Sequence, residues 1–301
     1  MREAIILGVI QGLTEFLPIS SIAHLRIIPA LLGWKDPGAA YSAVLQLGTL
    51  VAVLLYFASD LYGLIRAAWH DVREGRPFDS HEARLAWYIL LGTIPIGVCG
   101  LAFRRFVENE ARSLYVIAGS LILLAILLAV AERSGNHRLN MEQIGFVHTQ
   151  AVGLCQALAL VPGASRSGTT IMAGLFLGMT RETAARFSFL LGVPAIGASG
   201  LFELRELLQG GLGGAGLLHL LVATVISALT GYLAIDFLLR YLRTHTTYLF
   251  IWYRIGLGLL LLALLLTGRV APSLCESGAR RVDYALNHSS YSGSISDNHR
   301  A

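Results

Sequence analysis

The chain alternates long apolar stretches with short polar connections. A helix needs about 20 residues to cross the hydrocarbon core of a bilayer, and six stretches are apolar over that length. They are Ala39–Ser59, Leu85–Phe103, Ser113–Ala131, Thr183–Phe202, Leu212–Ile235 and Thr247–Gly268. The pattern predicts an all-α integral membrane protein with six transmembrane helices.

Two further apolar stretches are interrupted in the middle. Pro18 interrupts Ala4–Leu32, and Pro162 with the following glycine interrupts Gln143–Met179. Each reads as two short helices with polar residues at the break. Irregular backbone at membrane depth is tolerated only where it is buried in protein or lines a polar cavity, so we expect two re-entrant helical hairpins.

The composition supports a multi-pass membrane protein and excludes several other classes. Of the 301 residues, 55% are hydrophobic and 14% are charged, whereas soluble domains carry roughly 25% charged residues. The net charge of +4 suits loops beside anionic lipid headgroups. No basic helix or aromatic RNA motif accompanies that charge, so nucleic acid is not an expected partner. The three cysteines are far apart and indicate neither a disulfide framework nor a metal cluster.

The two broken segments resemble each other. Gly8–Leu13 matches Gly153–Leu158 at a spacing of 145, and one deletion then places Pro18–Ser21 against Pro162–Ser165. The membrane domain, residues 1–271, therefore divides into repeat halves of about 1–140 and 141–271. Residues 272–301 are polar and Ser-rich, and we expect a disordered tail.

Each half consists of one hairpin followed by three crossings, and an odd number of crossings makes the halves opposite in orientation. The sequence therefore predicts an inverted-topology repeat. Hairpins that enter from opposite faces meet near the midplane, as in transporters built from inverted repeats.

The first break carries a dense polar group. Gln11 and Glu15 are four residues apart, so they share one face of a helix. Ser20 and Ser21 follow Pro18 and can cap the next helix, and His24 comes three and four residues after them. Such groups are expensive in lipid and are functional by default. The alternative is that they only satisfy backbone groups freed by the break.

The second break resembles an anion cradle. Backbone N–H groups at the start of a helix point toward an anion, and arginine adds a forked, permanently charged donor. An arginine at this depth needs an anionic partner, either Glu15 of the other hairpin or a phosphate-bearing ligand. The residues of the cradle are Gly163, Ser165, Arg166, Ser167, Gly168 and Thr170.

These motifs carry a family resemblance. Gln11 with Glu15, the Pro18–His24 segment and the Pro162–Thr170 segment resemble the signature motifs of bacterial undecaprenyl-diphosphate phosphatases of the bacitracin-resistance type. The similarity covers about residues 1–270. Gln11 stands where the family often has Glu, and Ile22 stands where a small hydroxyl residue is common.

The resemblance implies a hydrolase of the bacterial plasma membrane. That family removes the terminal phosphate of a C55 isoprenoid diphosphate and regenerates the monophosphate carrier for cell-wall synthesis. The expected partners are this lipid diphosphate and membrane lipids, and a homodimer is kept as an alternative to a monomer.

Site roles follow from the needs of phosphoryl transfer, which are charge neutralisation and an in-line nucleophile. We expect Arg166 to hold the diphosphate. Ser21 is the candidate nucleophile with His24 as its base, because serine is weak unless a neighbour takes its proton. Glu15, assisted by Gln11, is expected to hold a divalent cation (Mg²⁺ or Ca²⁺), as the resemblance also suggests. A water nucleophile or a phospho-His24 intermediate stays open. The further expected substrate contacts are Gln11, Ser20, Gly163, Ser165, Ser167, Gly168 and Thr170.

The main alternative function is a transporter or flippase of an anionic lipid, because broken helices in inverted repeats are a transporter feature. A nucleophile and a base beside Glu15 favour catalysis, since an anion carrier needs neither. Arg254 in the last span is expected to be a structural partner or an interface residue rather than a substrate contact. Four glycines are expected to allow close helix approach, namely Gly97, Gly100, Gly197 and Gly200.

Overall fold

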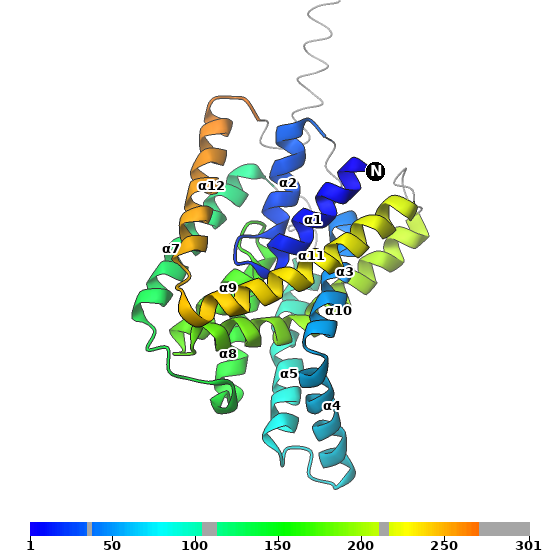
Figure 1. Cartoon of the computed structure of the whole chain (residues 1–301), viewed down its shortest axis with the longest axis vertical. Helices are drawn as coiled ribbons and strands as arrows, with labels where there is room; N and C mark the ends of the chain where they lie inside the picture. The colour runs from blue at the N-terminus through cyan, green and yellow to red at the C-terminus, as the bar shows by residue number, and fades with distance from the viewer. Residues whose placement is uncertain (35–37, 104–112, 211–216, 271–301) are drawn as a thin grey trace, which may run out of the picture.

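The computed structural model describes residues 1–34, 38–103, 113–210 and 217–270, and every regular element named in these ranges is a helix (Figure 1). The prediction of a disordered tail over 272–301 lies outside the described residues. The α-helices are α1 (Arg2–Phe16), α2 (Ser21–Leu32), α3 (Gly38–Tyr56), α4 (Ala58–Arg73), α5 (His81–Ala102), α7 (Leu114–Ser134), α8 (Phe146–Gln156), α9 (Arg166–Phe176), α10 (Arg181–Gly210), α11 (Leu217–Thr244) and α12 (Tyr248–Leu266).

The all-α membrane architecture is confirmed. Five described helices are long and apolar enough to cross a membrane, and the number becomes six if α3 and α4 count as one bent span. The predicted end of the fifth span at Ile235 was wrong, because α11 continues to Thr244. Asp236 marks the end of the apolar run, yet it stays in the helix and pairs with Arg240 one turn later at 3.0 Å.

The first span differs most from its prediction. Instead of one helix over Ala39–Ser59, α3 ends at Tyr56 and the chain turns by 76° into α4. Phe57 lies fully buried at the bend, against Phe189 of α10. Arg186 of α10 pairs with Asp60 in the first turn of α4 at 2.5 Å. Hydropathy alone could not detect this bend because apolar residues continue on one face of α4.

Both hairpins have the predicted form of two short helices around a break. The first hairpin is α1 and α2, and the second is α8 and α9, with a 3₁₀ turn over Ala157–Leu160 before its tip. The first packs on α11 and α3, and the second packs on α5, α7 and α10. In Figure 1, α11 crosses in front of α1, and α12 stands beside α7.

Three of the four glycines predicted to allow close helix approach do not have that role, and the role of Gly200 stays a prediction. A Cβ on Gly97 would meet nothing within 4 Å, and one on Gly100 or Gly197 would make only ordinary contact with a leucine. A Cβ on Gly12 would overlap α11, and one on Gly153 would overlap the backbone of Gly92. Glycines in the hairpin helices therefore permit close packing, as does Gly48 of α3, where a Cβ would overlap the Thr224 carbonyl of α11.

Candidate active site

The tips of the two hairpins meet, as the repeat predicted. The hydroxyl of Ser167 donates to the carbonyl of Leu17 at 3.0 Å, across 150 residues of sequence. Nη2 of Arg166 lies 3.1 Å from Oε1 of Glu15, and both side chains are largely buried. The anionic partner proposed for Arg166 on the first hairpin is therefore present.

Each tip starts its second helix with the same serine cap. The residue before Pro18 is extended, since proline disfavours the α region in its predecessor. Ser20 then adopts a φ of 75°, and its hydroxyl accepts from the Ala23 N–H at 3.3 Å. Ser165 has a φ of 71° and accepts from the Gly168 N–H at 3.1 Å. Positive φ is uncommon outside glycine, so this shared geometry is specific.

The caps correct the predicted match between the tips. The expected pairing placed Ser21 against Ser165, but the structure makes Ser20 the counterpart of Ser165. Ser20 comes two residues after its proline and Ser165 comes three residues after Pro162. The extra residue is accommodated by Gly163, whose φ of 92° favours glycine. Compared with the first hairpin, the second is one residue shorter before its proline and one residue longer between the proline and the cap.

Glu15 is the centre of the polar cluster. Its Oε2 accepts from Nε2 of Gln11 at 2.9 Å and from the hydroxyl of Ser21 at 2.7 Å, while Oε1 faces Arg166. Gln11, Glu15 and Ser21 are all buried. A carboxylate that accepts a serine hydroxyl next to a guanidinium can take a proton from that hydroxyl while the arginine holds an anion.

His24 does not contact Ser21 through any described hydrogen bond. Its Nδ1 lies 2.7 Å from the carbonyl of Ser20, and its Nε2 lies 2.6 Å from the hydroxyl of Tyr253. A carbonyl only accepts, so Nδ1 carries the proton and Nε2 of the neutral ring accepts from Tyr253. The Ser21 hydroxyl therefore pairs with Glu15 rather than with His24, and the catalytic roles of Ser21 and His24 stay predictions.

Arg254 holds both tips. It is 0% exposed and lies on α12. Its Nη1 donates to the carbonyl of Pro18 at 3.2 Å, and Nη2 donates to the carbonyls of Gly163 and Ala164 at 3.1 and 3.0 Å. Its Nε also donates to Leu121 of α7 at 3.3 Å. The expectation of a structural partner is confirmed, whereas the alternative of an interface arginine was wrong.

The other predicted cradle residues mostly face protein. Thr170 donates to the carbonyl of Arg166 at 2.7 Å and lies 2.5 Å from the hydroxyl of Ser188. A Cβ on Gly163 would overlap Ser120 and α7, and one on Gly168 would lie 2.6 Å from Nη1 of Arg254. These glycines let the second tip pack closely against α7 and Arg254.

Sequence reasoning missed three contributors. Tyr253 supports His24, Ser188 supports Thr170, and Gly192 of α10 makes room for Arg166, because a Cβ there would overlap its guanidinium. Tyr253 is remote in sequence from His24, whereas Ser188 and Gly192 lie on α10, the helix that follows the second hairpin. The one signal available was a polar residue in an apolar span, which does not reveal its partner.

A metal could be held here only together with a ligand. No group of three His, Cys, Asp or Glu side chains suited to a metal occurs among the described residues. Glu15 and Gln11 offer one carboxylate and one amide. Mg²⁺ typically takes one or two carboxylates and completes its shell with water and substrate phosphates, so this donor set fits a cation shared with a phosphorylated substrate.

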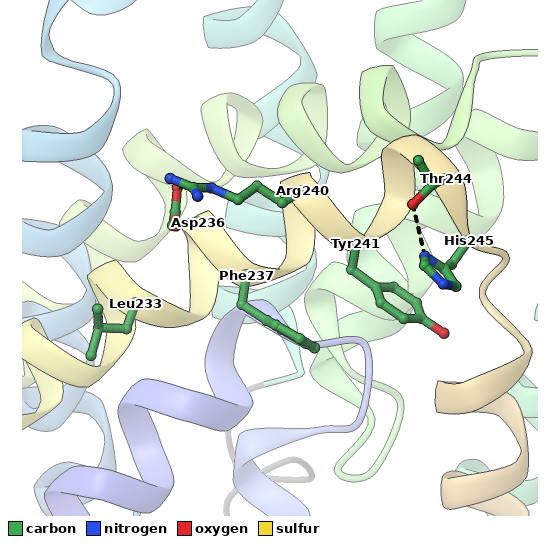
Figure 2. A pocket seen from close by; sticks show the side chains of 7 residues that line it. All are labelled: Leu233, Asp236, Phe237, Arg240, Tyr241, Thr244 and His245. Atoms are coloured by element: carbon green, nitrogen blue, oxygen red, sulfur yellow. Dashed lines mark hydrogen bonds and ion pairs between the residues drawn. The ribbon is translucent and has the colours of Figure 1, made fainter.

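A hollow of about 420 Å³ lies on the outside of α11, away from this cluster. Figure 2 shows Phe237, Tyr241 and His245 along it, with Arg240 paired to Asp236. Its lining consists of α11 residues and His245, and it contains no predicted site residue. The candidate chemistry is therefore at the hairpin tips.

Known proteins resemble this chain over most of its length. The family model described as "Bacitracin resistance protein BacA" matches residues 4–260. An undecaprenyl-diphosphatase of Myxococcus xanthus (strain DK1622) is 52% identical over 94% of this chain and 94% of its own length. One of Chlorobium phaeobacteroides (strain DSM 266 / SMG 266 / 2430) is 53% identical over 90% of this chain and 99% of its own length. The match spans both hairpins and nearly all of the membrane domain, and the chain belongs to the bacitracin resistance protein BacA family.

Proposed function

We propose that this protein is an undecaprenyl-diphosphatase of the bacterial plasma membrane. It hydrolyses undecaprenyl diphosphate to undecaprenyl phosphate and phosphate, which recycles the lipid carrier for cell-wall synthesis and underlies resistance to bacitracin. The observation that carries the proposal is the Glu15–Ser21–Arg166 cluster, built from both hairpins. The name shared by relatives about half identical over most of the chain supports it.

Arg166 supplies the charge that a diphosphate needs. Nη2 contacts Glu15, while Nη1 is buried and has no partner among the described residues. A guanidinium binds phosphate oxygens with a rigid fork. Nη1 is thus the donor available to the terminal phosphate, and Glu15 keeps the group oriented.

Ser21 is the proposed nucleophile and Glu15 its base. The Ser21 hydroxyl already donates to Glu15 at 2.7 Å. As the serine oxygen bonds to the terminal phosphorus, its proton passes to Glu15 and the anhydride P–O bond breaks. Undecaprenyl phosphate leaves, and water then releases phosphate from the serine. His24 stands next to this pair, so a water nucleophile or a phospho-histidine remains the alternative that the variants below decide.

A divalent cation is part of the proposal. Glu15 and Gln11 would hold Mg²⁺ or Ca²⁺ together with the substrate's phosphates. When bound, such a cation neutralises charge that develops on the phosphate oxygens during transfer. The transporter alternative is not favoured, because the relatives carry the name of a phosphatase. The oligomeric state stays a prediction.

The experiment is orthophosphate release from a C55 or C15 isoprenoid diphosphate by purified protein in detergent. We expect release by the wild type and none by Arg166→Ala. Arg240→Ala is the matched control, since Arg240 is an exposed arginine that pairs with Asp236 on the outside of α11. Equal release by Arg166→Ala and Arg240→Ala would place the reaction elsewhere, and no release by the wild type would overturn the function.

A further inference from the structure

Gln156 is a buried glutamine whose amide has no partner. It is 0% exposed, and neither Nε2 nor Oε1 has a hydrogen-bond partner within the described part of the chain. Its counterpart at the repeat spacing of 145, Gln11, is also buried but donates to Glu15 at 2.9 Å. The residue four positions after Gln156 is Leu160, which cannot accept that bond.

Stability does not explain a glutamine at this position. A buried polar group without a partner costs about 1–3 kcal/mol, and an apolar side chain of similar size would avoid that cost. Unsatisfied buried groups in native structures tend to mark a functional role or a bound molecule. The amide of Gln156 presents one unused donor group and one unused acceptor.

A second unpartnered group belongs to the same hairpin. It is Nη1 of Arg166, the donor assigned above to phosphate. The backbone of Gly153, one turn before Gln156, touches that of Gly92 on α5, and a Cβ on Gly92 would lie 3.3 Å from Leu191 of α10. Gly192, which follows Leu191 on α10, leaves space for the Arg166 guanidinium. Gln156 and Nη1 thus belong to the same junction of α5, α8 and α10.

We propose that Gln156 is a substrate-contacting residue that shares the diphosphate with Arg166. In the bound state its Nε2 donates to a phosphate oxygen and its Oε1 accepts from Nη1 of Arg166. That arrangement satisfies three unpartnered atoms at once. The inference rests on the proposed function and extends it, because it gives the second hairpin an uncharged phosphate-binding side chain beside the charged Arg166.

The test is Gln156→Leu, with Gln150→Leu as the matched control. Gln150 lies on the same helix and donates to the carbonyl of Tyr88 at 3.2 Å, so its amide already has a structural partner. We expect Gln156→Leu to keep or raise the melting temperature in detergent while kcat/KM for a C15 diphosphate falls about 10- to 100-fold, the range for a hydrogen bond to a charged group. Gln150→Leu should lower the melting temperature and leave kcat/KM within about twofold.

A binding measurement tests the same contact without turnover. Inorganic phosphate should raise the melting temperature of the wild type and of Gln150→Leu, and raise that of Gln156→Leu less. Unchanged kinetics in Gln156→Leu, or a loss of activity accompanied by a lower melting temperature, would make the glutamine structural and overturn the inference. If the wild type released no phosphate, the proposed function itself would fail, which is a different result.

Discussion

The two hairpins share a frame and differ in chemistry. Both carry a buried glutamine on the first helix, and both begin the second helix with a serine cap at positive φ. The first hairpin adds a carboxylate and an imidazole, Glu15 and His24. The second adds Arg166 and no acidic residue between Phe146 and Phe176.

The difference teaches how a composite site is divided. In the proposed mechanism the base and the hydroxyl belong to the same hairpin, so the proton moves within one hairpin. The hairpin that holds the guanidinium meets it from the opposite half of the chain. Neither half alone presents both the proposed nucleophile and the phosphate-binding arginine. The Glu15–Arg166 ion pair joins the two halves.

The largest expected effect breaks the clamp of the second hairpin. Arg166→Ala should abolish phosphate release while the protein stays folded in detergent. Arg166→Lys should restore little, because an ammonium cannot reproduce the guanidinium fork. Phosphate release and melting temperature are measured together. Near-normal turnover in Arg166→Lys would remove the clamp role.

The next effect separates nucleophile from base within the first hairpin. Ser21→Ala should be inactive, and Glu15→Gln should lose roughly 10²–10⁴-fold in kcat, the usual range for general acid–base catalysis. His24→Ala should lose less, since His24 contacts Ser20 and Tyr253 rather than Ser21.

Two results would redraw that assignment. Substantial turnover in Ser21→Ala with none in His24→Ala would move the nucleophile to His24 or to water. If a higher concentration of divalent cation restored the kcat of Glu15→Gln, the main role of Glu15 would be to bind the cation rather than to act as a base.

A smaller loss is expected where the hairpins are held together. Arg254→Leu should lower the free energy of unfolding by about 3–5 kcal/mol, because carbonyls of both tips lose their donor and each buried group left unsatisfied costs about 1–3 kcal/mol. Arg254→Lys should recover part of this, and Arg269→Leu, beyond the end of α12, is the control. Equal melting temperatures for wild type and Arg254→Leu would mean that the tips do not depend on α12.

The smallest effect tests whether the frame is truly shared. Ser20→Ala and Ser165→Ala should each cost about 1 kcal/mol, the usual value for an N-cap. Ser20→Gly and Ser165→Gly should each lower the free energy of unfolding by less, because glycine accepts the positive φ that the caps adopt. Melting temperatures of all four variants measure this. If only one of the two alanine variants lost stability, the two caps would share a geometry but differ in how much they stabilise the protein.

Much of this arrangement is predictable from the sequence. The spacing of Gln11 and Glu15 predicted one helix face, and their 2.9 Å contact confirms it. The odd number of crossings in each half predicted that the tips meet. These inferences succeed because periodicity and topology fix which segments come together.

The partner of Ser21 was not predictable in the same way. Ser21 lies three residues before His24 and six after Glu15, so sequence distance favours the histidine. The positive φ of Ser20 and the extended residue before Pro18 set the direction of the turn, and the hydroxyl donates to Glu15. The role of Arg254 was hidden for another reason, since backbone carbonyls have no signature in a sequence.

The position of Arg254 in the chain bears on how the protein is made. Both hairpins are synthesised well before α12, and the guanidinium that joins their tips arrives about 90 residues after the second tip. A nascent chain that stops before α12 has every residue of the Glu15–Ser21–Arg166 cluster but lacks the donor that its tip carbonyls need. The Arg254 contacts that join the two tips therefore form only after α12 has been synthesised, and shorter chains lack them.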